Sequence, residues 1–376
     1  MYTIAAATPR FLRPLRIVLP GGSGQVGQAL ARHFTERGHQ VTVLTRGPYT
    51  ASWQTVHWDG ENIGSWTEYL EGADVCINLA GRSVNCRYDA ANRQAIYESR
   101  IGSTRLLSRV IAGLSQPPQV WLNASAATIY RRAVDEDGID LPLDEACALS
   151  GDELAVENSE TQPSGTKAPA DSIALMYGLK PVPFTLEPVP FSEKTTERCA
   201  ERRGFSARVA RDWEAAFFAA ETPRTRKVAL RSAVVLSPTP GSAFAVLSHL
   251  VRTGFGGRQG NGCQFVCWIH EADYARAVEF LIEREELDGP VNIVAPNPLP
   301  NREFMAALRW AWDVPNGLPA PSLAIKLGAL LMRTEAELVL QSCRAVPGRL
   351  LGTGFEFEFA EWAKAAEDLV RQWKSR

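Results

Sequence analysis

Three glycines spaced three residues apart, Gly21, Gly24 and Gly27, carry the most specific chemistry in the sequence. They follow an apolar run at 15–20 and precede a stretch of helical periodicity at 28–37. In this setting the first glycine allows a tight turn, the second lets backbone N–H groups approach a pyrophosphate, and the third lets helix and strand pack closely. The helix N-terminus then favours phosphate binding. The pattern predicts a dinucleotide site, and an ordinary glycine-rich turn is the alternative.

The end of the second apolar run, 40–45, selects between the two nicotinamide cofactors. A site for NAD places an acidic residue there, which accepts a hydrogen bond from the ribose 2′-hydroxyl. This chain has Thr45-Arg46 instead, with no acid nearby. A guanidinium pairs bidentately with a 2′-phosphate. The sequence therefore favours NADP(H) over NAD(H), unless Arg46 is only a solvated loop residue.

These residues must be positioned by an α/β fold. Further apolar runs stand at 73–80, 119–124, 228–236 and 291–294, with helical stretches between them. Such alternation predicts a Rossmann-type doubly wound parallel sheet covered by helices on both faces. After 295 the chain is mostly helical, which indicates a smaller C-terminal substrate lobe.

The domain organisation follows from these changes in pattern. Residues 131–203 break the alternation, because acids and prolines are frequent there. We expect four parts: an N-terminal tail at 1–14, an NADP-binding Rossmann domain at 15–150 and 204–295, an acidic and proline-rich insertion at 151–203, and a C-terminal helical domain at 296–376.

Composition excludes several classes of protein. The 376 residues include 40 basic and 42 acidic side chains, so no global positive field attracts nucleic acid or anionic membranes. No apolar stretch approaches the roughly 18 residues that span a bilayer. The seven cysteines are scattered without zinc spacing, which is typical of a reduced, cytoplasmic protein. We expect a small-molecule substrate, no metal, and a monomer or homodimer.

Several motifs together resemble an extended, atypical short-chain dehydrogenase/reductase of the NAD-dependent epimerase/dehydratase type. More narrowly, the chain resembles the uncharacterised "epimerase family" oxidoreductases that end in a helical domain of unknown function. The resemblance covers most of 15–130 and 204–370 but not the insertion. Its motifs are Trp58-Asp59-Gly60, Asn78-Leu79-Ala80-Gly81, Ser99-Arg100-Ile101, Ala124-Ser125-Ala126, Asp212-Trp213-Glu214, Trp268-Ile269-His270, Asn292–Pro296, Asn301-Arg302-Glu303-Phe304 and Pro347…Leu350…Gly354-Phe355.

The resemblance implies a set of cofactor-binding residues. Arg46 would hold the 2′-phosphate and Asp59 would lie near the adenine, although Asp59-Gly60 is also ordinary turn chemistry. The pyrophosphate would be held by Gly21, Gly22, Ser23, Gly24, Gln25 and Val26. The ribose would lie beside Asn78, Leu79, Ala80 and Gly81.

The catalytic pair of such reductases is missing. A Tyr-x-x-x-Lys motif places both side chains on one helix face, but none of the eight tyrosines has lysine four residues later. Where the family has this helix, Ser206 and Ala210 stand at the two positions. Ser125 is the remaining candidate catalytic residue, and a serine that satisfies the backbone at a strand end is the alternative.

Polar groups near the predicted sheet edge could bind substrate. The candidates are Arg82, Arg87, Arg100 and Tyr130, and loop arginines are often simply solvated. Two functions remain open at this point. The first is an NADP-dependent oxidoreductase of atypical mechanism acting on an unknown small molecule, and the second is a non-catalytic NADP(H)-binding redox sensor or structural protein acting through a partner.

Overall fold

The computed structural model describes residues 13–47, 50–130, 133–135, 139–147, 149, 204–322, 325 and 340–376. All of them belong to one compact unit. The predicted insertion at 151–203, nearly all of the predicted N-terminal tail, and most of the expected helical stretch between 321 and 341 lie outside the described residues.

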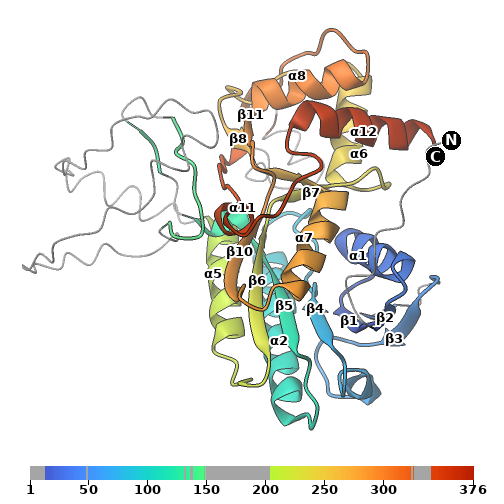
Figure 1. Ribbon diagram of the computed structural model, residues 1–376. Coiled ribbons are helices and arrows are strands. Elements are labelled where there is room, and N and C mark those ends of the chain that lie inside the picture. Colours follow the sequence, from blue (N-terminus) through green and yellow to red (C-terminus); the bar gives the residue numbers. More distant parts are fainter. Residues whose placement is uncertain are drawn as a thin grey trace, which may run out of the picture. The chain divides into compact units, whose positions relative to one another are not determined.

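The centre of this unit is a seven-stranded sheet, and every neighbouring pair of strands in it is parallel (Figure 1). The strand order is β10-β6-β5-β4-β1-β2-β3, so the order reverses beside β1. The strands are β1 (Arg16–Pro20), β2 (Gln40–Thr45), β3 (Gln54–His57), β4 (Val75–Asn78), β5 (Val120–Ala126), β6 (Arg226–Ser232) and β10 (Gly289–Ile293). The predicted Rossmann-type doubly wound sheet is confirmed.

Two details differ from the sequence expectation. The edge strand β3 was not predicted, because its four residues are exposed or half-buried and do not form an apolar run. The apolar run 228–236 is not one strand. It divides into β6 and β7 (Val234–Leu236), and β7 leaves the main sheet to pair with β9 (Trp268–His270).

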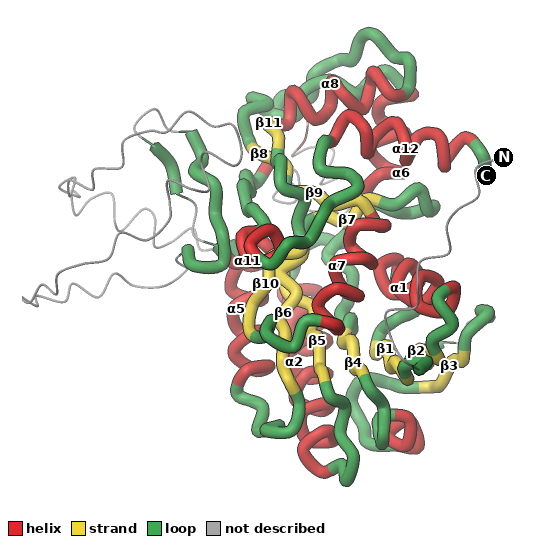
Figure 2. The backbone as a smooth tube through the Cα atoms, viewed as in Figure 1, coloured by secondary structure: helices red, strands yellow, loops and turns green. Residues whose placement is uncertain are grey.

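Helices cover both faces of the sheet (Figure 2). Buried strands of a parallel sheet are apolar on both faces, because alternate residues point to opposite sides. Ile17 and Leu19 pack toward α1 (Gln25–Glu36) and α7 (Glu271–Glu283). Val18 lies in the opposite core with α2 (Ala90–Gly113) and α5 (Phe205–Phe218). The short 3₁₀ helices η1 (Ser65–Tyr69) and η2 (Ala127–Ile129) follow β3 and β5.

The C-terminal lobe has a separate aromatic core. Phe304 stacks on Trp362 with ring centroids 4.1 Å apart, and Trp268 meets Trp362 edge-on at 5.1 Å. These rings hold together α8 (Asn301–Ala311), α12 (Trp362–Lys374) and β9. The lobe also contains α6 (Ala243–Arg252), β8 (Phe265–Val266) and β11 (Leu299–Pro300), whereas α11 (Gly348–Gly352) packs through Leu350 on the core of the main sheet.

A buried carboxylate attaches the last segment to the sheet-covering helix α7. Asp273 is fully buried and accepts the backbone N–H groups of Glu358 and Phe359 at 3.0 and 2.7 Å. It also accepts a charge-assisted hydrogen bond from Arg276 at 2.6 Å. A nearby contact joins His270 to Asp368 of α12, with Nε2 and Oδ2 3.2 Å apart. The C-terminal lobe is thereby anchored to the end of the sheet.

The turn after β1 brings helix and strand into unusually close contact. A Cβ on Gly27 would lie 2.4 Å from the Cα and the carbonyl oxygen of Gly22, and real Cβ atoms do not approach backbone so closely. Gly21 has a φ of 75°, and a Cβ there would lie 2.7 Å from the backbone nitrogen of Ala80. Glycine is therefore required at Gly27, where α1 meets the turn, and at Gly21, where the turn meets the backbone that follows β4.

We predict that Gly27→Ala destabilises the protein by about 2–3 kcal/mol, because the added carbon must push α1 away from the turn. Gly102→Ala is the matched control, since Gly102 is exposed in the interior of α2 and a Cβ there would have no atom within 4 Å. The control should be neutral or stabilising by up to about 1 kcal/mol. Urea unfolding of the three proteins measures the difference, and equal midpoints would contradict the steric argument.

Candidate functional site

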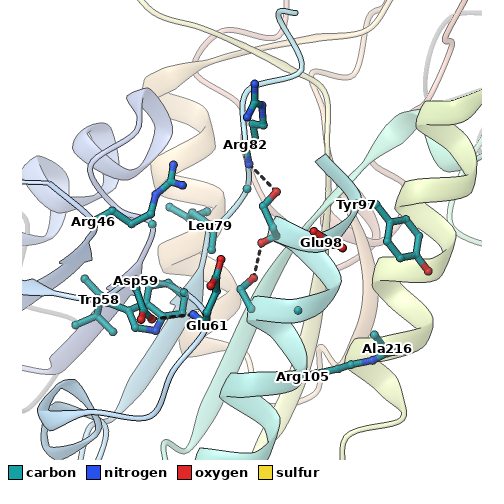
Figure 3. Close-up of a pocket in the computed structure, with 18 of the residues that line it drawn as sticks. Arg46, Trp58, Asp59, Glu61, Leu79, Arg82, Tyr97, Glu98, Arg105 and Ala216 are labelled. Atoms are coloured by element: carbon teal, nitrogen blue, oxygen red, sulfur yellow. Dashed lines mark hydrogen bonds between the residues drawn. The ribbon is translucent and has the colours of Figure 1, made fainter. Parts of the chain in front are cut away.

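One cleft of about 1520 Å³ opens at the carboxyl ends of β1, β2 and β4 (Figure 3). This is the edge where ligands bind in open parallel sheets, next to the point where the strand order reverses. It is lined on one side by Gly21, Ser23, Gly24, Leu44, Thr45, Arg46, Trp58, Asp59, Gly60, Glu61, Leu79, Ala80, Gly81 and Arg82, and on the other by residues of α2 and α5. Most of the predicted cofactor residues thus meet at one place.

The N-terminus of α1 faces this cleft with its backbone donors unused. The N-cap residue Gly24 brings no side-chain cap, and the first turn contains no acidic residue. The first N–H groups of a helix have no intrahelical partner, so they are available to an anion. A Cβ on Gly24 would meet only the Gly21 carbonyl oxygen, at 3.7 Å. The space above this helix end is therefore open.

The guanidinium of Arg46 enters the cleft from the end of β2. Among the residues that the structure describes, no carboxylate lies within ion-pair distance of it, and Figure 3 shows its side chain pointing toward the space near Leu79. The preceding Thr45 donates a hydrogen bond to the Ser23 hydroxyl at 3.0 Å, which ties the end of β2 to the glycine turn. A fixed, unpaired cation beside a helix N-terminus can bind a phosphate.

Asp59 lines the cleft, but its carboxylate is engaged in a local turn. It accepts the N–H groups of Glu61 and Asn62 at 2.8 and 2.9 Å, and the Asn62 amide at 2.8 Å. The hydrogen bonds from Asn62 and then from Glu61 lower the pKa of Asp59 to about 2. Asp59-Gly60 is thus a turn, as one interpretation had it, and this turn forms part of the cleft wall. Its position near an adenine stays a prediction.

The residues at the end of β4 have two roles: one supports the cleft wall from inside the fold, and the next three line the cleft. Asn78 is fully buried, donates to Asn123 Oδ1 at 2.7 Å and accepts the N–H of Ala80 at 3.1 Å. It does not reach the cleft surface. Leu79, Ala80 and Gly81 do line the cleft. Asn78 thus acts through the backbone of Ala80, which it holds in place.

Three residues of the glycine turn do not line the cleft with their side chains. Gly22 is buried beneath Leu19 and Val43, and Val26 packs against the core under α1. The Gln25 side chain donates to the Val235 carbonyl at 3.2 Å, which links α1 to β7. Any contact of Gln25 or Val26 with a phosphate would therefore come from the backbone.

Ser125 and Tyr130 belong to a buried network instead of the cleft. The Ser125 hydroxyl donates to Glu214 Oε1 at 2.6 Å, and Arg231 contacts both oxygens of Glu214 at 2.9 and 2.8 Å. Arg231 also donates to the Tyr130 hydroxyl at 3.0 Å, which in turn donates to Asn292 Oδ1 at 2.6 Å. The network joins β5, β6, β10 and α5.

In this network the charges of Arg231 and Glu214 neutralise each other as a buried ion pair. Burial by itself would lower the pKa of Arg231, but its hydrogen bonds and charge interaction with Glu214 raise it. Burial raises the pKa of Tyr130. Because the Ser125 proton is already directed at Glu214, the structure does not direct it toward a ligand in the cleft. The sequence around Ser125 contains no pattern that predicts its hydrogen bond to Glu214.

The predicted substrate-binding arginines lie in different surroundings. Arg82 lines the cleft, and its side chain donates to Asn92 Oδ1 at 2.7 Å. Arg87 is exposed and is not part of the cleft wall. Arg100 lies directly behind Gly81. The two α5 positions aligned with the missing catalytic pair are the half-buried Ser206 and the buried Ala210.

Sequence reasoning missed the wall that α2 and α5 supply. Figure 3 shows Tyr97 and Arg105 on the side of α2 that faces α5. The Tyr97 hydroxyl pairs with the Asp212 carboxylate, and burial followed by that charge raises the pKa of Tyr97. The only signal was helical periodicity, which places residues four apart on one face but does not say which face borders a cleft.

Two kinds of feature are absent from the described residues. No helix in that part of the chain is long and apolar enough to cross a membrane. The same residues include no group of three or more His, Cys, Asp or Glu side chains placed to hold a metal ion.

Comparisons with known proteins agree with this architecture. Residues 17–149 match the NAD dependent epimerase/dehydratase family, and residues 320–369 match a domain of unknown function, DUF1731. The bovine epimerase family protein SDR39U1 is 29% identical over 367 residues, covering 95% of this chain and 100% of the relative. A Staphylococcus aureus (strain MW2) epimerase family protein, MW0731, is 26% identical, covering 94% of this chain and 99% of that protein.

A solved structure has the same fold. The crystal structure of human epimerase family protein SDR39U1 (isoform 2) with NADPH superposes with a TM-score of 0.72 and 25% identity. The match covers 95% of this chain and 99% of that one. The resemblance inferred from the motifs is confirmed by these matches.

We predict that Glu214→Gln lowers the free energy of unfolding by about 3–5 kcal/mol, because it leaves the buried Arg231 without its counter-charge. Replacing both members, as Glu214→Leu with Arg231→Met, should cost less than the single change. Asp212→Asn, two residues away on α5 and only half-buried, should change stability by about 1 kcal/mol or less. Urea denaturation of the three variants tests this, and a harmless Glu214→Gln would show that the pair is not structurally important.

Proposed function

We propose that this chain, which belongs to the extended short-chain dehydrogenases/reductases of the NAD-dependent epimerase/dehydratase family, binds NADPH in the cleft and acts as an oxidoreductase on a small molecule. One observation carries the cofactor choice. The helix N-terminus of α1 and Arg46, which has no ion-pair partner among the described residues, face the same cleft, and no acid stands at the end of β2. The crystal structure of the human relative was determined with NADPH, which supports the same choice.

The residues present fit this cofactor. The open space at Gly24 and the uncapped start of α1 would receive the pyrophosphate. Arg46 would pair with the 2′-phosphate, a contact that NADH cannot make. Leu79, Ala80 and Gly81 would lie beside the ribose, with their backbone held by Asn78. Asp59 would border the adenine with its turn rather than with a free carboxylate.

Catalysis requires hydride transfer and a proton. Bound nicotinamide supplies the hydride donor or acceptor. The chain's contribution would be positioning of the substrate and exclusion of water, which can account for much of a rate enhancement. With Ser206 and Ala210 at the usual catalytic positions and Ser125 bound to Glu214, the proton would come from water or from another group of the cleft.

The same observations favour one alternative. A chain that keeps the cofactor cleft but lacks the tyrosine and lysine can use NADP(H) as a structural ligand or a redox signal for a partner. The two functions make the same prediction for cofactor binding and opposite predictions for turnover.

We predict that Arg46→Ala raises the Kd for NADPH by about 10- to 100-fold and changes the Kd for NADH by less than about 2-fold. The reason is that only NADPH carries the phosphate with which a charge-assisted pair forms. Isothermal titration of both proteins with both cofactors measures this. Equal losses for the two cofactors would remove Arg46 from the 2′-phosphate site.

We predict that the purified protein transfers deuterium from C4-deuterated NADPH to a metabolite of a cell extract. Each face of C4 is labelled in a separate reaction, and the products are read by mass spectrometry. The Arg46→Ala variant at a concentration of NADPH below its raised Kd is the control. If a metabolite receives deuterium from only one face of C4, the protein is an oxidoreductase. Tight NADPH binding without any labelled product supports the non-catalytic alternative.

A further inference from the structure

We infer that Arg100 forms an anion-binding site at the Gly81 side of the cleft, which takes a carboxylate or phosphate group of the molecule bound there. The inference deepens the proposed function, because it names the chemistry of one group of the ligand. The group belongs either to the cofactor or to the substrate, and the two sources are separated experimentally below.

The hydrogen bonds of Arg100 leave one edge of its guanidinium unused. Nη1 donates to the carbonyl oxygens of Arg82 and Ile96, at 3.1 and 3.0 Å. Nε and Nη2 have no partner among the described residues, and no carboxylate of these residues lies within 4.0 Å of the group. The unused edge, Nε with Nη2, is one that binds an anion through two parallel hydrogen bonds.

Three other buried or half-buried arginines have either a carboxylate partner or more acceptors than Arg100. Arg231 is paired with Glu214, and Arg276 with Asp273 at 2.6 Å. Arg226 has no such carboxylate but donates to three carbonyl oxygens, those of Leu281, Ile282 and Leu287. Arg100 therefore differs from them in lacking both a counter-charge and a full set of acceptors.

Burial disfavours the charged form of the Arg100 guanidinium. It lowers the pKa of Arg100 to about 10, with only weak opposing contributions from Tyr88 and Cys86. The group still carries its charge at neutral pH. A half-buried charge without a counter-ion is costly to keep, and an anionic ligand would remove that cost on binding.

The position of Arg100 is fixed by two neighbours. A Cβ on Gly81 would lie 3.2 Å from Cζ, 3.3 Å from Nη2 and 3.4 Å from Nε. Because these distances are nearly equal, Gly81 packs over the face of the guanidinium, where a Cβ would be in tight contact with it. The guanidinium also lies over the Trp213 ring, 5.3 Å from its centroid. Contacts on the face hold the group in place and leave its edge free.

Arg100 does not itself line the cleft, but three of its neighbours do. Gly81, Arg82 and Ser99 all line it, and Ser99 Oγ accepts the backbone N–H of Arg82 at 2.9 Å. None of the four acidic residues of the cleft wall forms an ion pair with Arg100. Asp212 pairs with Tyr97, Glu98 accepts from Gln94 at 2.5 Å, and Asp59 and Glu61 belong to the turn after β3. A second cation, Arg82, stands at the same end. The charge of Arg100 is therefore not neutralised by the wall, and an anionic ligand group could pair with it.

The test uses the full chain with Arg100→Met, which keeps the length and the apolar contacts of the side chain but removes the charge. Arg100→Lys is the second variant, because it keeps the charge but loses the paired donors. Arg93→Met is the matched control: Arg93 is on the same helix, is exposed, and contacts an aromatic ring, Phe205, at 5.5 Å, but it does not line the cleft.

Two arms distinguish the source of the anion. In the first, NADPH and NADH are titrated into each protein. In the second, inorganic phosphate is titrated into protein saturated with NADPH. If the cofactor supplies the anion, Arg100→Met raises both cofactor Kd values by about 10-fold or more, unlike the NADPH-selective effect of Arg46→Ala. If the substrate supplies it, cofactor affinity is unchanged and the wild-type protein binds phosphate in the second arm, which Arg100→Met abolishes.

Arg100→Lys should show an intermediate loss in whichever arm responds, and Arg93→Met should show none. The inference is overturned if Arg100→Met and Arg100→Lys leave both cofactor affinity and phosphate binding at wild-type values. It is also overturned if Arg100→Met does not change the cofactor Kd values and the wild-type protein binds no phosphate. A thermal-shift titration with phosphate in the absence of cofactor is run in parallel. It tests Arg100 even if NADPH fails to bind, so that failure of the proposed function and failure of the anion site give different results.

Discussion

The close approach of α1 to the end of β1 is the constraint on which the cleft depends. Gly22 and Gly27 meet at a distance that excludes a single added carbon, so the helix axis is fixed against the strand. Because the helix begins at this contact, its free N–H groups point across the ends of β1, β2 and β4. The remaining walls are then placed relative to that helix end: Thr45 is tied to Ser23, and Gly21 packs against the backbone at Ala80.

The charges of the protein fall into two groups with different tasks. In the first, each cation has a partner inside the fold, as Arg231 has in Glu214 and Arg276 has in Asp273. Such pairs join elements that are far apart in sequence, and removing one partner leaves a buried charge unsatisfied. In the second, Arg46 and Arg100 have no carboxylate partner among the described residues. Arg46 lines the cleft, and Arg100 stands behind the wall residue Gly81. An anionic ligand group in or beside the cleft could therefore pair with either of these two cations.

Sequence patterns predicted two kinds of feature: buried strands, which recur as apolar runs, and the tight turn after β1, which only glycine can form. The glycine spacing located the tight turn between β1 and α1, and the apolar runs located six of the seven strands, because buried parallel strands are apolar on both faces. The edge strand β3 escaped since it is not buried. Ser125 was misplaced for a related reason: residue type does not reveal on which side of the sheet a strand-end hydroxyl points, and here it faces Glu214. Contacts between α2 and α5 depend on tertiary packing, so no local pattern could predict the second wall of the cleft.

The attachment of the last segment to α7 also sets an order of events in time. The sheet-forming residues end at Ile293, yet Asp273 receives two of its hydrogen bonds from Glu358 and Phe359. A ribosome therefore produces the complete sheet well before it produces these two donors. Until then the growing chain carries an acid with only Arg276 to satisfy it, on a helix that covers the sheet, and Trp268 lacks the ring of Trp362 against which it packs. The nucleotide-binding part of the nascent protein thus waits for its most distal segment before it can reach its final stability.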